Sequence, residues 1–411
     1  MGKEVFSLLF PSPCLAFKVL MFILPMFPYP SGNLHMGHVR VYTLTDVLAR
    51  YWRAKGCNVI HPIGWDSFGL PAEKAALQRG IHPELWTESN ISAMKVQLKA
   101  LNISFDWSRE LKTSSPAYFK WTQWLFVKLW QAGLTFRASR EVNWDPVDET
   151  VLADEQVDSQ GKSWRSGAKV EKRDLLQWFF RISAYREEML RTLDGDEAKL
   201  WPSSVVHSQK LWLPKMNDWL VSRQRYWGTP IPIVHCSTCG EVAVPFEQLP
   251  VLLPENWSAP LWKHETWKNC ACPKCNSPAE RETDTLDTFV DSSFYFLRFL
   301  DGENKKELCS PSKMQQADIY TGGIEHATSH LLYARFIWMF LRKEFQRLDL
   351  PLLPFRQLIS QGMLLGRTLQ CTKTGKYLAP ELESAFTSDC KVSWIGKHWK
   401  NEHKHFESEA R

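Results

Sequence analysis

Apolar runs alternate with helical stretches along the first third of the chain. The pattern predicts a strand at residues 19–26, a helix at about 38–55, a strand at 58–63, and helices ending near Arg79, Leu98 and Gln131. Strands that alternate with helices predict a parallel sheet with helical crossovers. A ligand of such a sheet binds at the carboxyl ends of its strands.

Two stretches interrupt this alternation. Residues 137–176 become polar and charged, and Pro and Cys become dense between Thr229 and Pro278, so both stretches are predicted to be insertions. A strand, a turn and a helix return over residues 318–345. Apolar periodicity fades after about Ala379 while Lys, His and Glu accumulate, so we expect a poorly ordered tail.

The composition is that of a globular chain. Its 411 residues and 44% hydrophobic content allow two or three domains with a buried core. The net charge of +5 permits a nucleic-acid partner but does not argue for one. Trp121, Trp124 and Trp130 have helical spacing and are predicted to be packing residues.

The amino-terminal region favours neither a membrane span nor a targeting peptide. The apolar run at residues 15–27 contains Lys18 and Pro25, is too short to cross a bilayer, and is interpreted as a buried strand. Lys3 lies beside Glu4 and no Arg precedes Arg40, so a targeting signal is expected to be absent, atypical or truncated.

Five of the ten cysteines lie between Cys236 and Cys275. Cys236 pairs with Cys239, and Cys272 with Cys275, in Cys-x-x-Cys spacing, with Cys270 spare. Two such pairs can supply four thiolates to one tetrahedral zinc ion. The 32 residues between the pairs exceed the usual zinc-ribbon spacing, so free core thiols stay as the alternative.

A turn rich in Pro and Gly follows the first strand and leads into a helix. His35 and His38, three residues apart, share one helical face at a helix start, where free N–H groups suit a nucleotide phosphate. Gly37 between them has no side chain to block a flat base. Two surface histidines at a helix cap would give the same spacing, so both interpretations stay open.

Gly322-Gly-Ile-Glu-His326 forms a second Gly-rich turn, between a strand at residues 318–321 and a helix. Glycines let the backbone approach a ligand, and Glu325 and His326 can hydrogen-bond a ribose or a purine edge. A lone Gly-Gly turn is weak evidence without further context.

Leu34-His-Met-Gly-His38 resembles the first signature motif of class I aminoacyl-tRNA synthetases. Further blocks, in the same order, resemble leucyl-tRNA synthetase of the bacterial and mitochondrial type: residues 26–32, 62–73, 106–110, 222–228 and 281–289. The resemblance covers roughly residues 25–378. It implies an α/β fold: a Rossmann-like parallel-sheet catalytic domain with a small zinc-ribbon-like lobe inserted.

The resemblance also implies a domain order. Residues 25–136, 213–232 and 281–378 would form the catalytic domain, interrupted by a lobe with a stub of an editing domain at 137–212 and by the zinc-ribbon-like insertion at 233–280. Residues 1–24 and 379–411 match nothing in the family.

The family's functional residues transfer to matching positions. His35 and His38 are implied to be catalytic, stabilising charge on the α-phosphate of ATP, and the implied ATP site comprises His35, Gly37, His38, Gly322, Gly323, Glu325 and His326. Asp66 matches the carboxylate that holds the leucine ammonium group; an exposed turn Asp is the alternative. The remaining implied leucine-binding residues are Phe27, Tyr29, Phe296, Tyr320 and His330, with Phe296 where many relatives have Tyr.

The implied ligands are ATP with Mg²⁺, leucine and tRNA(Leu), with a structural Zn²⁺ on Cys236, Cys239, Cys272 and Cys275. Related enzymes often hold another zinc ion in the earlier insertion. Asp145, Ser163 and Ser166 stand where those cysteines would fall, so no metal is expected there.

Several family parts are missing from the sequence. No Lys-Met-Ser-Lys-Ser loop is found, and the nearest lysine pair is Lys373 and Lys376. The editing domain is absent between Trp212 and Leu213, so mischarging should go uncorrected. The anticodon-binding bundle and carboxyl-terminal tRNA-binding domain are also unmatched, so weak and salt-sensitive tRNA binding is expected.

Three hypotheses follow. The first is a leucine-tRNA ligase that makes leucyl-adenylate and transfers leucine to tRNA, without editing in this chain. The second is a truncated variant that only binds leucine or ATP, and the third is an unstable fragment. Resemblance of residues 143–148 to organellar relatives implies the mitochondrial matrix, with the cytoplasm as the alternative.

Overall fold

The computed structural model describes residues 19–152, 157–158, 160–163, 166–257 and 260–362, and the backbone of three later strands, Gly366–Cys371, Tyr377–Leu378 and Cys390–Ile395. Lys373 and Lys376 lie outside the described residues. The chain forms two compact units. The first extends to Ala138 and includes Gln177–Gly322 and His326–Ser360, and the second contains Ser139–Leu176, Gly323–Glu325 and the described residues from Gln361 onward.

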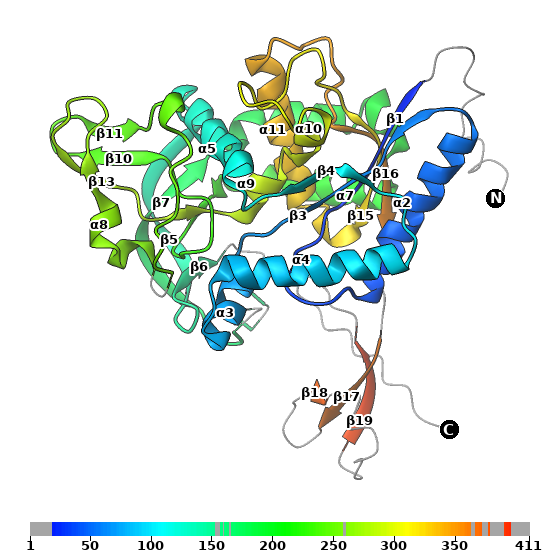
Figure 1. Cartoon of the computed structure of the whole chain (residues 1–411), viewed down its shortest axis with the longest axis horizontal. Coiled ribbons are helices and arrows are strands. Elements are labelled where there is room, and N and C mark those ends of the chain that lie inside the picture. Colours follow the sequence, from blue (N-terminus) through cyan, green and yellow to red (C-terminus); the bar gives the residue numbers. More distant parts are fainter. Residues whose placement is uncertain are drawn as a thin grey trace. The chain divides into compact units, whose positions relative to one another are not determined.

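A four-stranded sheet of the first unit, called the central sheet below, has the order β16-β15-β1-β2, and β1, β15 and β16 are labelled in Figure 1. Its strands are β1 (Leu20–Pro25), β2 (Asn58–Ile60), β15 (Ala317–Gly323) and β16 (Phe355–Gln361). β1 runs parallel to both neighbours, with Met21 opposite Val59 and Leu24 opposite Tyr320. Every residue of β1 after Leu20 is buried, as expected for a parallel strand covered on both faces. The predicted α/β class with a parallel sheet is confirmed.

The single strand predicted at residues 58–63 is wrong, because the chain changes partner at His61. β2 ends at Ile60 and pairs with β1, whereas β3 (Pro62–Trp65) pairs in parallel with β4 (Asp106–Lys112). Pro62 has no N–H group to continue a ladder, which explains the break.

Helices connect these strands. α2 (Met36–Ala54) buries Val41, Tyr42, Thr45, Asp46, Ala49 and Trp52 along one stripe, the pattern of an amphipathic helix. It begins two residues before the predicted start. The predicted ends of the next helices are confirmed within two residues by α3 (Leu70–Arg79), α4 (Pro83–Ala100) and α5 (Pro116–Gln131). Trp121 of α5 is buried, and Trp124 and Trp130 are partly buried.

The region after α5 contains strands that lead into and out of the second unit. β5 (Thr135–Asp145), β6 (Thr150–Leu152), β7 (Glu171–Phe180) and β8 (Trp219–Leu220) form a sheet in the order β6-β5-β7-β8. Between β7 and β8 lie α6 (Arg186–Thr192) and α7 (Ser203–Trp212). α7 continues directly into a 3-10 turn, η4 (Leu213–Lys215), so the chain remains ordered across Trp212 and Leu213.

The Cys-rich stretch forms an antiparallel sheet in the order β11-β10-β13-β12. Its strands are β10 (Ile233–Cys236), β11 (Gly240–Ala243), β12 (Asn269–Ala271) and β13 (Pro278–Arg281). Val234, Val244 and Leu249 form a small apolar cluster of their own here.

The last third returns to the central sheet. α10 (Tyr295–Leu300) is buried along its whole length, and α11 (His330–Glu344) buries twelve residues. Such helices are enclosed by the fold rather than lying on its surface. The remaining short elements are β9 (Ser222–Arg223), β14 (Thr285–Leu286), α8 (Glu265–Lys268), α9 (Thr288–Ser292), η2 (Ile182–Tyr185), η3 (Asp196–Leu200), η5 (Phe246–Gln248), η6 (Leu261–Lys263) and η7 (Ile324–His326).

The second unit contains its own pairings. Asn143, Trp144 and Asp145 of β5 pair with β6, and β17 (Gly366–Cys371) pairs with β18 (Tyr377–Leu378) and β19 (Cys390–Ile395). β19 lies inside the stretch that the sequence predicts to be poorly ordered. Across the described part of the chain, every helix is too short or too polar to cross a membrane.

His61 makes the stability of the fold dependent on pH. It is 0% exposed, its ring centroid lies 4.6 Å from that of Phe105, and burial lowers its pKa to about 4. The unfolded chain takes up this proton near pH 6.5, so the folded state binds fewer protons between pH 4 and 6.5 and loses stability as the pH falls through this range.

We therefore expect the fall in unfolding free energy between pH 7 and pH 5 to be about 2 kcal/mol smaller in His61→Phe than in the wild type. Urea denaturation at the two pH values measures it. The exposed His207 supplies the control, since His207→Phe should keep the wild-type pH dependence. Equal pH dependence in His61→Phe and wild type would contradict the assignment.

Candidate functional site

The start of α2 is capped by two histidines that act reciprocally. Nδ1 of His35 accepts hydrogen bonds from the backbone N–H groups of Gly37, at 3.1 Å, and His38, at 3.4 Å. Nδ1 of His38 in turn accepts from the backbone N–H of His35, at 3.2 Å. The rings stack with centroids 3.7 Å apart. The sequence predicts the pair on one face, and the structure shows that they also form a capping box.

This cap determines where the imidazole protons lie. A ring nitrogen that accepts from a backbone N–H carries no proton, so each neutral ring carries its proton on Nε2. Burial, with a smaller effect of His35, lowers the pKa of His38 to about 4, which keeps its ring neutral near pH 7. Both rings can therefore offer an Nε2–H donor to an anion at the helix start.

Gly37 is required by the cap itself. A Cβ at this position would lie 2.8 Å from Cε1 and 2.9 Å from Nδ1 of His35. Any side chain would push the His35 ring out of its bonded position. The sequence suggests that glycine stands here to leave room for a base. The structure adds a second reason, which is that a side chain at this position would collide with the His35 ring.

Asp66 lies directly after β3 and is buried, with 1% of its surface exposed. Its Oδ1 accepts a hydrogen bond from the hydroxyl of Thr113, at 3.3 Å, and its backbone N–H donates to the Pro28 carbonyl. Burial, and then the charge of Asp291, raise its pKa well above the usual range. No Lys or Arg pairs with it in the described part of the chain, so a ligand cation would relieve a buried carboxyl group. The alternative of an exposed turn Asp is excluded.

Aromatic rings from separate elements meet: Phe27 just after β1, Tyr320 within β15, and Tyr295 and His330 at the starts of α10 and α11. Phe27 stacks on Tyr295 with ring centroids 4.1 Å apart, and the Tyr295 ring lies 6.2 Å from that of His330. The hydroxyl of Tyr320 shares a 2.9 Å hydrogen bond with Nε2 of His330. Burial lowers the pKa of His330 to about 3, so the ring is neutral. The hydroxyl of Tyr295 donates to the Pro25 carbonyl at 3.0 Å and is hydrogen-bonded to Tyr320. The rings themselves are apolar, and an aromatic surface of this kind suits a small aliphatic side chain.

Two of the proposed leucine-site residues lie differently from the others. Phe296 packs against Trp338 and Phe355, away from Phe27, because α10 turns its ring into the core. Its neighbour Tyr295, which the sequence does not single out, is the ring that meets Phe27 and His330. Tyr29 is 37% exposed, so it lies at the rim.

The second Gly-rich turn ends β15. A Cβ on Gly322 would collide with Cε of Met26, so any other residue would require the Met26 side chain to move where β15 passes the end of β1. The ring of His326 lies 6.3 Å from that of His330. Gly323 and Glu325 belong to the second unit, where a Cβ on Gly323 would collide with the Glu325 carboxylate.

The four paired cysteines converge. The sulfur atoms of Cys236, Cys239, Cys272 and Cys275 all lie within 4.8 Å of one another. Two turns bring them there, and the residue after each second cysteine, Gly240 or Asn276, has positive φ, 73° and 60°. The two Cys-x-x-Cys turns therefore end in the same left-handed backbone conformation, although 32 residues separate them.

This arrangement fits a tetrahedral zinc ion. Zn–S bonds of about 2.3 Å place ligand sulfurs about 3.8 Å apart, and the sulfurs of Cys236 and Cys275 are 3.6 Å apart. Cys270 lies outside the cluster and packs against the apolar residues of the lobe. The four cysteines Cys236, Cys239, Cys272 and Cys275 would therefore hold the ion.

The earlier lobe has hydrogen bonds at the corresponding place. The hydroxyl of Ser166 donates to Asp145 at 2.7 Å, and the Ser166 backbone N–H donates to the hydroxyl of Ser163 at 3.3 Å. Asp145 also accepts from the N–H groups of Val147 and Asp148. These bonds link the segments that carry the three residues.

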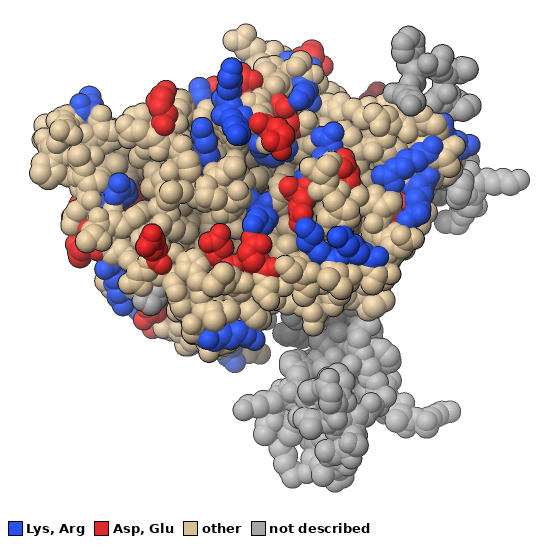
Figure 2. All heavy atoms as spheres, viewed as in Figure 1, with Lys and Arg blue, Asp and Glu red and all other residues tan. Residues whose placement is uncertain are grey.

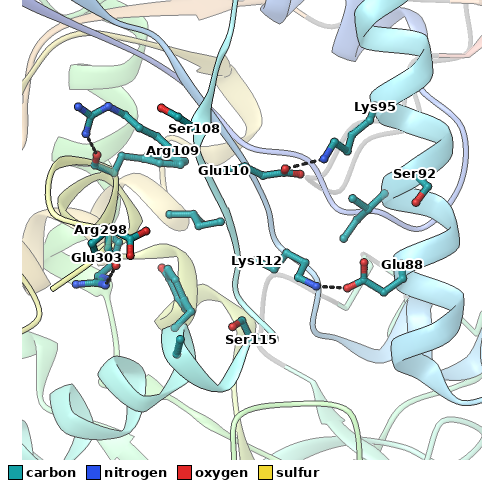
Figure 3. A pocket seen from close by; sticks show the side chains of 16 residues that line it. Glu88, Ser92, Lys95, Ser108, Arg109, Glu110, Lys112, Ser115, Arg298 and Glu303 are labelled. Carbon is teal, nitrogen blue, oxygen red and sulfur yellow. Dashed lines mark hydrogen bonds and ion pairs between the residues drawn. The ribbon is translucent and has the colours of Figure 1, made fainter. Parts of the chain in front are cut away.

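A polar cavity of about 570 Å³ between α4, β4 and α10 contains none of the predicted site residues. The ion pairs Glu88–Lys112 and Lys95–Glu110 cross from α4 to β4 (Figure 3). Its charges are thus largely matched internally. On the face shown in Figure 2, basic and acidic side chains are interspersed, so charge does not mark a nucleic-acid surface there.

Comparisons with known proteins agree with this geometry. The family model for class I tRNA synthetases (I, L, M and V) matches residues 18–378. Proteins named leucine–tRNA ligase from Thermosynechococcus vestitus and Gloeobacter violaceus are 35% and 36% identical, each over 88% of this chain and over 65% and 66% of their own. The chain thus spans just under two thirds of their length.

Solved structures show the same similarity. The LeuRS of Agrobacterium radiobacter K84, in a ternary complex with tRNA and LeuAMS, superposes with a TM-score of 0.78 and 32% identity, covering 92% of this chain and 67% of that one. Methionyl-tRNA synthetase of Mycobacterium tuberculosis shares the fold, with a TM-score of 0.58 and 18% sequence identity. The superposition covers 84% of this chain and 57% of that one.

The cysteine cluster yields a testable expectation. Cys272→Ser should weaken zinc binding by more than about 100-fold, because loss of a ligand costs more than loss of an outer-shell partner. Competition with a chromophoric chelator measures the affinity. Cys270→Ser is the matched control and should bind zinc like the wild type. Equal affinity in Cys272→Ser and Cys270→Ser would exclude the four-sulfur site.

Proposed function

Because this chain belongs to the class I tRNA synthetases for isoleucine, leucine, methionine and valine, we propose that it activates leucine with ATP to form leucyl-adenylate. The observation that carries the proposal is the reciprocal cap at the start of α2. It leaves the Nε2 atoms of two imidazole rings as donors at a helix end that attracts anions, and the His38 ring is neutral near pH 7.

The reaction follows from these groups. A carboxylate oxygen of leucine attacks the α-phosphorus of ATP, a new O–P bond forms, and pyrophosphate leaves as its magnesium complex. His35 and His38 would donate hydrogen bonds to the phosphate oxygens as charge develops on them. Asp66 would hold the leucine ammonium group, which fixes the carboxylate for attack.

Leucine is the proposed amino acid for two reasons. The rings of Phe27, Tyr295, Tyr320 and His330 form a mostly apolar group, in which Tyr320 is hydrogen-bonded to both Tyr295 and His330. The relatives that match over 88% of the chain are named leucine–tRNA ligase. Gly322 and His326 are proposed to border the adenosine.

Transfer of leucine to tRNA(Leu) is proposed as the second step. The relative from Agrobacterium is named as a complex with tRNA, which supports this step. Contacts to the phosphate backbone would make that binding depend on salt.

Editing is proposed to be absent. The alignment with the Thermosynechococcus relative runs over 562 positions, although this chain has 411 residues. Within the aligned region, the relative therefore contains residues that this chain lacks. The ordered passage from α7 to η4 at Trp212 and Leu213 is where we place that gap. We also propose zinc on the four cysteines, and the mitochondrial matrix as the location with the cytoplasm as alternative.

A binding module without turnover is the second candidate. The sequence carries no recognisable lysine loop, and such a loop neutralises departing pyrophosphate in the family. Loss of one such donor costs roughly 10²- to 10³-fold in rate and affects ground-state binding less. A chain that binds ATP and leucine but turns over poorly would fit the same geometry.

Leucine-dependent exchange of pyrophosphate into ATP tests the proposal. We expect His38→Ala to reduce exchange roughly 10²- to 10³-fold by removing a donor to the transition state. Asp66→Ala should chiefly raise the KM for leucine. His207→Ala, at an exposed histidine, should match the wild type.

The possible results separate the two candidates. No exchange in well-folded wild-type protein that still binds ATP and leucine would leave the binding module. Exchange that survives in His38→Ala would show that the α2 cap is not the phosphate site.

A further inference from the structure

Gln209 lies on α7, three residues before Trp212, and is fully buried. Its Nε2 group donates to the backbone carbonyl of Ala327 at 2.8 Å. Its Oε1 accepts a hydrogen bond from Nη1 of Arg335 on α11. One amide therefore joins α7 both to the turn after β15 and to the helix that follows it.

The orientation of the Gln209 amide follows from chemistry. A guanidinium group only donates hydrogen bonds, so Gln209 must present Oε1 to Arg335. Its N–H group is then directed to the carbonyl of Ala327, and the two contacts cannot be exchanged. Because Trp212 is the last residue of α7, this amide lies about one helical turn before the junction with Leu213.

Arg335 makes this contact costly to lose. It is 0% exposed, and its Nη2 donates to the carbonyl of Met189 and to the hydroxyl of Thr192 on α6. These partners and Gln209 are all neutral, and no carboxylate pairs with Arg335 among the described residues. Because a buried cation without a counter-charge depends on its hydrogen bonds, α6, α7 and α11 are held as one group.

Ala327 lies between two residues of the proposed site. His326 immediately precedes it, and His330 begins α11 three residues later. The rings of His326 and His330 are 6.3 Å apart, and His330 shares its hydrogen bond with Tyr320. A fixed Ala327 carbonyl restricts the rotation of the peptide that joins the adenosine side of the site to the leucine side.

We infer that Gln209 is a positioning residue for the adenylate site: it holds the turn of residues 326–330 in place through the carbonyl of Ala327. The inference rests on the proposed function for its catalytic meaning. It also gives α7 a role of its own beside the junction with Leu213, as the support of this turn.

Gln209→Glu separates the two contacts. A carboxylate at this position accepts from Arg335 as the amide does, and adds an ion pair, but it has no N–H group for Ala327. Gln209→Met removes both contacts. Gln123 offers the matched control, since it is equally buried and donates to the carbonyls of Pro230 and Val251, away from the site.

Hydrogen–deuterium exchange of the ligand-free protein tests the positioning. We expect exchange in residues 326–332 to rise about tenfold in Gln209→Glu and in Gln209→Met, the size expected for one lost buried hydrogen bond. Gln123→Met should leave this segment unchanged. Unchanged exchange in both Gln209 variants, or an equal rise in Gln123→Met, would overturn the inference.

Calorimetric titration with LeuAMS, the leucyl-adenylate analogue of the Agrobacterium complex, measures whether the position of the turn affects binding at the site. Gln209→Glu should bind LeuAMS about tenfold more weakly than the wild type, and Gln123→Met should bind it equally well. Wild-type affinity in Gln209→Glu would overturn the role in the site. Absence of binding by the wild type would instead overturn the proposed function, while the exchange data would still decide whether Gln209 holds the turn.

Discussion

The unsatisfied N–H groups at the start of α2 are the constraint from which the site is built. A helix leaves its first N–H groups without partners inside the helix. Here His35 and His38 supply the acceptors, and in doing so they fix their own tautomers. The same bonds that begin the helix therefore leave Nε2 as the donor atom of each ring. This cap favours glycine at position 37, because a Cβ there would displace the His35 ring.

Buried charges show where the fold gives up stability for a site. Burial raises the pKa of Asp66, the nearby carboxylates raise it further, and the described chain supplies no Lys or Arg to pair with it. Arg335 is buried with neutral partners only. Groups of this kind are costly unless they are well bonded. Asp66 can accept a ligand cation, whereas Arg335 directs its hydrogen bonds to α6 and α7, so only Asp66 has the character of a binding group.

Local patterns predict much of this molecule from its sequence. β1, the ends of α3 to α5 and the cysteine pairs follow from periodicity and spacing, which short segments carry. The division of residues 58–65 into two strands at His61 cannot be predicted locally. It depends on β2 pairing with β1 and β3 pairing with β4, which are long-range contacts. Tyr295 cannot be chosen over Phe296 from the sequence, because adjacent aromatic residues on a buried helix differ only in what they face. The Gln209 contact joins positions more than a hundred residues apart, and no local pattern marks it.

One buried side chain near the end of α7 ties this helix to two other parts of the fold. The amide of Gln209 serves Ala327 and Arg335 together, and the helix ends about one turn later. A shorter α7 would leave Arg335 without one of its acceptors and the turn before α11 without its donor. α7 must therefore extend at least to Gln209 for Arg335 and this turn to keep both contacts.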